Sequence, residues 1–162
     1  MRTTSEFWLR GAVFRHVTLK GRVGGMIVRG AYWPGDPGVK EAFAQANDEF
    51  YKTVDWALDI SEANFTADVE LSVVPGHLII RDPETQILVT QRRLLENNAW
   101  MALRGHPSGW GIELTAISNT PNGNGVLVAP KKASFFKENM QAIEFLREHD
   151  LVEPDDAMPS RN

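Results

Sequence analysis

Apolar and polar positions alternate most clearly between residues 66 and 94, where they predict the centre of a sheet. Residues 69–73 read Val-Glu-Leu-Ser-Val, which is typical of a strand with one buried and one solvated face. Downstream, the Asp-Pro-Glu-Thr of residues 82–85 separates two β-rich runs, and its Asp and Pro suit the first two positions of a type I turn. We therefore expect three antiparallel strands joined by short turns, near residues 67–74, 77–82 and 86–93.

Two sections of these strands are apolar at every position rather than at alternate ones. They are Leu78–Ile80 and Ile87–Val89. A strand of this kind usually has other parts of the protein packed on both of its faces. We therefore expect both sections to lie in the middle of the sheet.

Further hairpins are predicted on either side of this centre. Residues 7–19 and 26–33 have strand character, and a glycine-rich turn joins them. Residues 109–118 place Ile112, Leu114 and Ala116 on one face of a strand, and a loop of turn-forming residues leads from it to a short strand at 126–128. Between these regions, residues 99–103 favour a short helix ended by Gly105, with an edge strand as the alternative.

Two helices are predicted from apolar residues at spacings of three and four. The first spans about 36–58, with Asp36 as its cap and an apolar stripe that should cover one face of the sheet; residues 59–65 then form a connector. Its stripe comprises Val39, Phe43, Ala46, Phe50, Val54 and Leu58. The second helix spans about 134–149. Its stripe comprises Phe136, Met140, Ile143 and Leu146, widened by Phe135 and Phe145.

These elements predict an α+β fold, because the strands arrive in hairpins and do not alternate with helices. We expect one antiparallel sheet of about six to seven strands with the two main helices packed on it. Residues 1–152 form a single domain in this interpretation. The composition of residues 153–162 predicts a disordered C-terminal tail.

Composition narrows the classes of protein without naming one. The chain has 162 residues, of which 43% are hydrophobic and 23% charged, as in ordinary globular domains. It has no cysteine, which excludes disulfides and thiolate chemistry and fits a reducing compartment. The absence of a signal-peptide core or of an apolar run of roughly 20 residues predicts a cytoplasmic protein without a membrane segment. The net charge of −4 disfavours nucleic acid as a partner.

A small hydrolase-like enzyme is one functional hypothesis. Its catalytic candidate is His106, which lies in a loop framed by glycine and proline, with Glu113 or Asp82 as a carboxylate partner. The ordinary alternative is a solvated loop histidine. No nucleophile motif, phosphate-binding loop or zinc-ligand spacing accompanies His106, so we expect neither a cofactor nor a metal.

Carboxylates are numerous but scattered. Asp59, Glu62, Asp68 and Glu70 could approach one another on adjacent elements. A solvated acidic face is the commoner outcome for such a group. Sequence alone cannot pair carboxylates in an unknown topology.

Single-strand nucleic-acid binding is a second alternative. Its candidate residues are the cations Arg92, Arg93, Lys131 and Lys132, with tryptophans nearby in the sequence as stacking platforms. The acidic total and the lack of a recognised nucleic-acid-binding motif count against this hypothesis.

The leading hypothesis is a protein-binding module that docks another protein or a second copy of itself. The chain has five tryptophans, and tryptophan is enriched in interface hot spots as well as in cores. Size and charge would suit an inhibitor, an immunity-type antagonist, a chaperone or a self-assembling accessory protein. The residues predicted to bind the partner are Trp56, Trp100, Trp110, Phe135 and Phe145.

Overall fold

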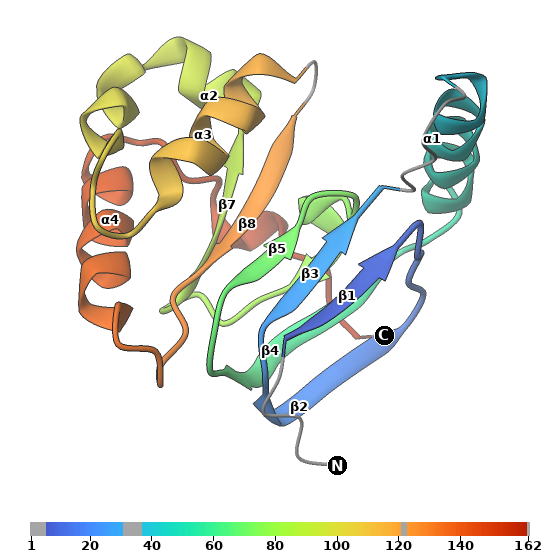
Figure 1. Ribbon diagram of the computed structural model, residues 1–162, viewed down its shortest axis with the longest axis horizontal. Helices are drawn as coiled ribbons and strands as arrows, with labels where there is room; N and C mark the ends of the chain where they lie inside the picture. Colours follow the sequence, from blue (N-terminus) through green and yellow to red (C-terminus); the bar gives the residue numbers. More distant parts are fainter. Residues whose placement is uncertain (1–5, 31–36, 121–122, 162) are drawn as a thin grey trace.

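Three small sheets and several helices make up the protein in a computed structural model, which describes residues 6–30, 37–120 and 123–161 (Figure 1). The class is α+β, as predicted, but the predicted single antiparallel sheet is wrong. Two of the sheets have three parallel strands each, and the third has two antiparallel strands. Hairpin-like turns are present in the sequence, yet most of them join strands that belong to different sheets.

Strands near one another in the chain alternate between the two parallel sheets. The first sheet consists of β1 (Phe7–Arg10), β3 (Met26–Arg29) and β5 (Val69–Leu71), paired in that order. The second sheet consists of β2 (Val17–Val23), β4 (Leu58–Phe65) and β6 (Ile79–Ile80), also paired in that order. The chain thus coils between two stacked layers, and each return places a strand parallel to its predecessor in that layer.

The corner between β2 and β3 explains why no hairpin forms there. Gly25 lies against the next corner of the coil, where a Cβ atom would be 3.2 Å from the carbonyl oxygen of Asp68. The backbone N–H of Met26 donates to that same oxygen at 2.9 Å. Only glycine fits such a close approach without displacement. Stacked corners therefore send β2 to pair with β4, and β3 to pair with β1 and β5.

The third sheet and most of the helices form the C-terminal half. Its strands are β7 (Gln86–Thr90) and β8 (Asn124–Val128), and its α-helices are α2 (Gln91–Glu96), α3 (Trp110–Asn119) and α4 (Phe136–Glu148). Short 3₁₀ helices occur at Gly76–Leu78, Asn98–Leu103 and Asp155–Ala157. The second predicted helix, 134–149, corresponds closely to α4.

The third sheet separates two hydrophobic cores. On β7, Leu88 packs in the core of the N-terminal half, whereas Ile87 and Val89 pack in the core under the C-terminal helices. On β8, Val126 and Leu127 divide in the same way. Ile87–Val89 is therefore covered on both faces, as expected, but its expected position in the middle of a sheet is wrong, because its sheet has only two strands. The same expectation is wrong for Leu78–Ile80, since Ile79–Ile80 forms β6 at the edge of the second sheet.

The turn at residues 82–85 forms, but it does not make a hairpin. Asp82 accepts hydrogen bonds from the Glu84 backbone N–H at 3.1 Å and from the Thr85 hydroxyl at 2.8 Å. The strands on either side then diverge, because β6 pairs with β4 and β7 pairs with β8. The sequence therefore predicts this turn correctly, but it does not predict which strands pair on either side of the turn.

Residues 110–118 form a helix where a strand was predicted. The spacings of four and three between Trp110, Leu114 and Ile117 suit a helix, and these three residues are buried. The alternating apolar residues of the same segment suit a strand equally well. Gly109 precedes α3 with a φ of 76°, a left-handed conformation that glycine adopts readily. Ile112, which the predicted strand placed on one face with Leu114, is 84% exposed on the helix.

The first predicted helix is shorter than expected and does not cover a sheet with its whole stripe. It is α1 (Pro37–Tyr51), and the connector predicted at 59–65 belongs to β4. Phe43 is 41% exposed and Ala46 is exposed, so much of the stripe faces solvent. The predicted cap Asp36 and the end of the strand predicted at 26–33 lie outside the described residues.

Candidate functional site

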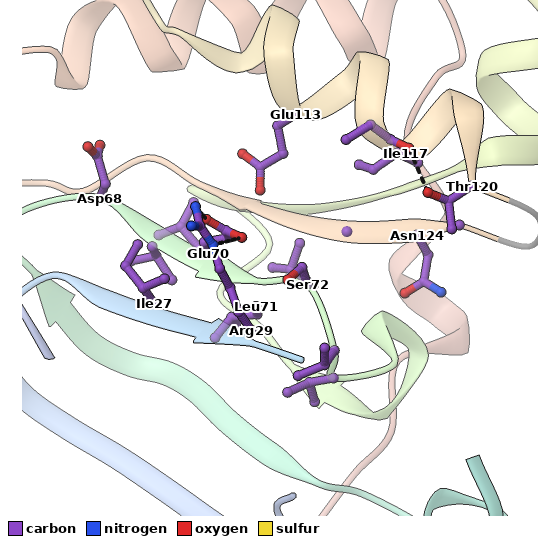
Figure 2. A pocket seen from close by; sticks show the side chains of 18 of the residues that line it. Ile27, Arg29, Asp68, Glu70, Leu71, Ser72, Glu113, Ile117, Thr120 and Asn124 are labelled. Atoms are coloured by element: carbon purple, nitrogen blue, oxygen red, sulfur yellow. Dashed lines mark hydrogen bonds and ion pairs between the residues drawn. The ribbon is translucent and has the colours of Figure 1, made fainter. Parts of the chain in front are cut away.

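A cleft of about 990 Å³ lies between the first sheet and α3, with α1 at its edge. Its floor is the outer face of β1, β3 and β5, and its opposite wall is one side of α3 and the start of β8. Figure 2 shows these walls facing each other. A concave site of this size is the ordinary place for a ligand or a partner segment.

The floor is built by strand alternation. On β5, Val69 and Leu71 pack into the core, so Glu70 between them points to the cleft. On β3, Val28 packs inward and Arg29 points outward. The same alternation on β1 leaves Trp8 on the cleft side with 49% of its surface exposed.

The wall is built by helical periodicity. The buried stripe of α3 fixes the helix on the C-terminal core. Glu113 and Ile112 then project from the other side and line the cleft. Glu113 is partly buried, and Ile112 is almost fully exposed at the rim. Figure 2 shows the Glu113 carboxylate reaching from α3 toward Glu70 on the opposite wall.

Carboxylates dominate the charge of this cleft. Five acidic side chains line it against one basic side chain, that of Arg29. The acidic ones are Glu6, Asp48, Asp68, Glu70 and Glu113. Arg29 is already engaged, because its Nε and Nη2 donate to Glu70 at 2.7 and 2.5 Å and its guanidinium lies 5.2 Å from the centre of the Trp8 ring. The cleft therefore keeps an excess of negative charge.

Glu113 is the most perturbed carboxylate of the site. Burial, followed by the negative charges of Glu70 and Asp68, raises the pKa of Glu113 to about 7. No hydrogen bond to its carboxylate occurs within residues 6–30, 37–120 and 123–161. Among the described residues, Glu113 thus has no cationic partner, and it lies near two like charges. A bound cation would reduce the repulsion between these charges.

His106 does not join a catalytic pair in this structure. Its Nδ1 lies 3.0 Å from the Ser108 hydroxyl and 3.2 Å from the Ser108 backbone nitrogen. Among the described residues its ring contacts no carboxylate, and Glu113 lines the cleft whereas His106 does not. Asp82 lies in the turn after β6, where the Lys131 ammonium is 2.9 Å away. The enzyme hypothesis built on His106 stays a prediction without a site around it.

The predicted nucleic-acid residues are mostly paired with carboxylates. Arg92 and Arg93 both approach Glu153, at 3.0 and 3.5 Å. Lys131 pairs with Asp82, and Lys132 is exposed. Nucleic-acid binding by these residues stays a prediction.

The predicted partner-binding aromatics lie mainly in the cores. Trp56 and Trp110 are each 7% exposed, and Trp100 is 2% exposed. Phe135 and Phe145 are half-buried, with Phe145 stacked on His149 at 4.2 Å between ring centres. Trp110 alone of these five lines the cleft. Their role in binding a partner stays a prediction. Because the three tryptophans are buried, other side chains form most of the exposed surface of the cleft.

The comparisons with known proteins give no family. No family model matches the chain, and neither curated proteins nor solved structures contain a significant match. No described helix is long and apolar enough to cross a membrane. Within the described parts of the chain, no three histidine or acidic side chains are grouped so that they could hold a metal ion. Function therefore has to be argued from the cleft itself.

Sequence reasoning named Glu113, as a possible partner of His106, and Trp110, as a partner-binding residue, but it missed Trp8 and Ile112. Trp8 was not among the residues predicted to bind a partner, and Ile112 was placed on one face of a predicted strand. Of the four carboxylates that could have approached one another, Asp68 and Glu70 line the cleft, while Asp59 and Glu62 lie on β4 in the other parallel sheet. The signal for the site was helical spacing at 110–117, which competed with an equally good strand pattern.

Proposed function

We propose that this protein is a protein-binding module and that the cleft between the first sheet and α3 is its docking surface. The observation that carries the proposal is the exposure of Ile112 at the rim of an acidic cleft, with Trp8 exposed on the opposite wall. A large apolar side chain that is 84% exposed gains most when a partner covers it. A small molecule lying within the cleft would leave the rim uncovered.

The chemistry of the cleft specifies the partner segment. Five carboxylates against one engaged arginine favour a cation, and Glu113 has no cationic partner among the residues that the structure describes. Trp8 and Ile112 favour apolar side chains on either side of that cation. The occupant is therefore a segment of another protein that carries a lysine or arginine between apolar residues.

A display library of random short peptides, selected against the whole protein, tests this chemistry. We expect enriched sequences to carry a lysine or arginine flanked by leucine or aromatic residues. Enrichment of acidic or uncharged peptides would contradict the proposal. Affinities of the enriched peptides are then measured by calorimetry for the wild type and for matched variants.

Two pairs of variants separate docking in the cleft from non-specific binding. Glu113→Gln should weaken peptide binding about tenfold to hundredfold, because one charge-assisted contact is lost. Its control is Glu96→Gln, an exposed carboxylate on α2. Ile112→Asp should remove binding, and its control is Leu95→Asp, since Leu95 is 69% exposed on α2 away from the cleft lining. Equal effects from test and control variants would sink the proposal.

The raised pKa of Glu113, at about 7, also predicts a pH dependence of binding. Glu113 faces Glu70 and Asp68, and a cationic ligand favours its ionised form. Peptide binding should therefore be tighter at pH 8 than at pH 6 and should release protons in that range. Glu113→Gln should remove this dependence. An unchanged pH profile in that variant would exclude Glu113 as the cation-binding group.

An acid–base enzyme is the second candidate, and the pKa of Glu113 is the observation that favours it. A carboxyl group with a pKa near 7 can donate a proton at neutral pH, and the nearby Asp68 could serve as the second carboxylate. A panel of chromogenic esters, phosphate esters and glycosides tests this candidate. Turnover that Glu113→Gln abolishes would favour the enzyme over the docking module.

A further inference from the structure

Two charged side chains are buried in the N-terminal half, away from the cleft. Asp59 on β4 is 0% exposed, and Arg81, just after β6, is 2% exposed. The neighbours of Asp59 in the strand, Leu58 and Ile60, fill the core between the parallel sheets. Asp59 therefore points to the opposite face of the second sheet. Buried charges of this kind are costly unless a partner of opposite charge is present.

Both partners come from the C-terminal segment, residues 153–161, which we call the strap. The Nε of Arg161 donates to Asp59 Oδ2, and its Nη2 lies 3.3 Å from Glu62 Oε1. Asp155 Oδ1 accepts from Arg81 Nη2 at 3.3 Å. The strap follows α4 in the chain, and Figure 1 shows the C-terminus lying in the N-terminal half of the molecule near β4. These contacts of the strap thus connect residues between 74 and 102 positions apart in the sequence.

The Asp59 site has the features that distinguish a guanidinium from an ammonium. Ser61 satisfies one oxygen of Asp59, because its hydroxyl and backbone N–H donate to Oδ1 at 2.7 and 3.0 Å. The other oxygen accepts from Arg161. Glu62, three residues after Asp59 on β4, offers a second acceptor, Oε1, which also accepts from Lys20 Nζ at 2.8 Å. A planar guanidinium presents separate nitrogens to two acceptors in a fixed fork, whereas an ammonium must donate to both from one compact nitrogen.

The other end of the strap is fixed to the third sheet. The Glu153 backbone N–H donates to the Leu88 carbonyl at 2.8 Å, and its carboxylate accepts from the Thr90 hydroxyl at 2.6 Å. The strap therefore begins on β7 and ends on β4. These contacts lie in the segment that was predicted to be a disordered tail, which in this structure is held at residues 153, 155, 158 and 161. Disorder of the tail in solution is the alternative that the experiment below decides.

We propose that Asp59 and Glu62 form a guanidinium-binding site whose ligand is Arg161 of the same chain, so that residues 153–161 fasten the C-terminal half to the second sheet. The site is separate from the cleft and does not depend on the proposed docking function. It assigns a role to the C-terminal residues that composition alone assigned to a disordered tail.

Backbone ¹⁵N relaxation of the full chain tests the strap. We expect order parameters near those of the folded body, about 0.85, for residues 155–161 in the wild type and values below about 0.6 near residue 161 in Arg161→Ala and Asp59→Asn. Arg22→Ala, an exposed arginine on the neighbouring β2, is the matched control and should leave the strap ordered. A flexible strap in the wild type, or an ordered one in Arg161→Ala, would overturn the proposal.

A small cation tests the site itself. In Arg161→Ala, added methylguanidinium should shift the amide resonances of Ser61 and Glu62, and methylammonium at the same concentration should shift them much less. The double variant Asp59→Asn/Arg161→Ala should lose the response. If Asp59→Asn fails to fold, the comparison of the two cations in Arg161→Ala still tests whether the site prefers a guanidinium. Equal responses to the two cations, or none, would contradict a guanidinium site.

Discussion

Glu113 and Asp59 are two carboxylates in the same small protein whose surroundings shift their pKa values in opposite directions. Burial acts to raise the pKa of both. At Asp59, hydrogen bonds from Arg161 and Ser61 outweigh burial and bring the pKa below its ordinary value. At Glu113, the charges of Glu70 and Asp68 add to burial and bring the pKa to about 7. The difference is the presence of a cation from the chain itself at one carboxylate and its absence at the other.

This contrast suggests how the two faces of the molecule are used. The second sheet supplies a carboxylate whose cation arrives in the same chain, so that face is closed by the strap. The cleft supplies a carboxylate, that of Glu113, which has no cationic partner in the described parts of the chain and lies beside exposed Ile112. A carboxylate without a nearby cation beside an exposed apolar side chain is typical of a surface that binds a partner.

Of the two carboxylates, Asp59 is expected to have the larger effect on stability. Asp59→Asn should lower the free energy of unfolding by about 1.5–3 kcal/mol, because it removes the charge that the guanidinium of Arg161 binds. Denaturation in urea measures this change. Asp55→Asn, on an exposed carboxylate near the start of the same strand, is the control and should change the stability far less. Similar losses in both variants would remove the distinction between the buried and the exposed carboxylate.

The two carboxylates should also respond differently to pH. Because the pKa of Asp59 is lowered in the folded state, its stabilisation is present above the unfolded value of about 3.8 and is lost as the pH falls through the folded pKa. The stability difference between the wild type and Asp59→Asn should therefore narrow under acid. Urea denaturation at pH 6 and at pH 3 measures it. A difference that is the same at both pH values would contradict the assigned pairing.

A smaller effect of opposite sign is expected at Glu113. Because its folded pKa is raised, the stabilisation it provides is present below the unfolded value of about 4.5 and is lost as the pH rises through about 7. Glu113→Gln should therefore stabilise the protein at pH 8, by on the order of 1 kcal/mol, and should have little effect at pH 4. Thermal unfolding at the two pH values measures this. Destabilisation at pH 8 would show that the carboxylate has a cationic partner.

The smallest effect on stability is expected at the exposed rim of the cleft. Trp8→Ala should change the free energy of unfolding by no more than about 0.5 kcal/mol, since half of its surface is already exposed. Trp100→Ala, in the core of the C-terminal half, should cost about 3–5 kcal/mol and serves as the contrast. A large loss of stability in Trp8→Ala would make it a structural residue rather than part of a docking surface.

Local features of the fold could be predicted from the sequence, and the partnership between elements could not. The turn at Asp82, the last helix and the two-sided burial of Ile87–Val89 follow from short-range chemistry and periodicity. The parallel pairing of β2 with β4 depends on corners that stack across about 40 residues, and nothing near Gly25 in the sequence distinguishes such a corner from a hairpin turn.

The candidate site was predictable only in part, for the same reason. Asp68 and Glu70 were recognised as carboxylates that could meet others, but Glu113 joins them only because residues 110–119 are a helix. The spacing of two between Ile112 and Leu114 fits a strand as well as the spacing of four between Trp110 and Leu114 fits a helix. The surrounding tertiary structure decides between those two patterns.

The most direct test of the contrast is an NMR titration of the side-chain carboxyl carbons of Glu113 and Asp59 in one sample of the wild-type protein. We predict a midpoint near pH 7 for Glu113 and a midpoint below the ordinary aspartate value for Asp59. Midpoints close to the ordinary glutamate and aspartate values would contradict the account. They would show that Glu113 is not buried beside like charges in solution and that Asp59 is not paired with Arg161.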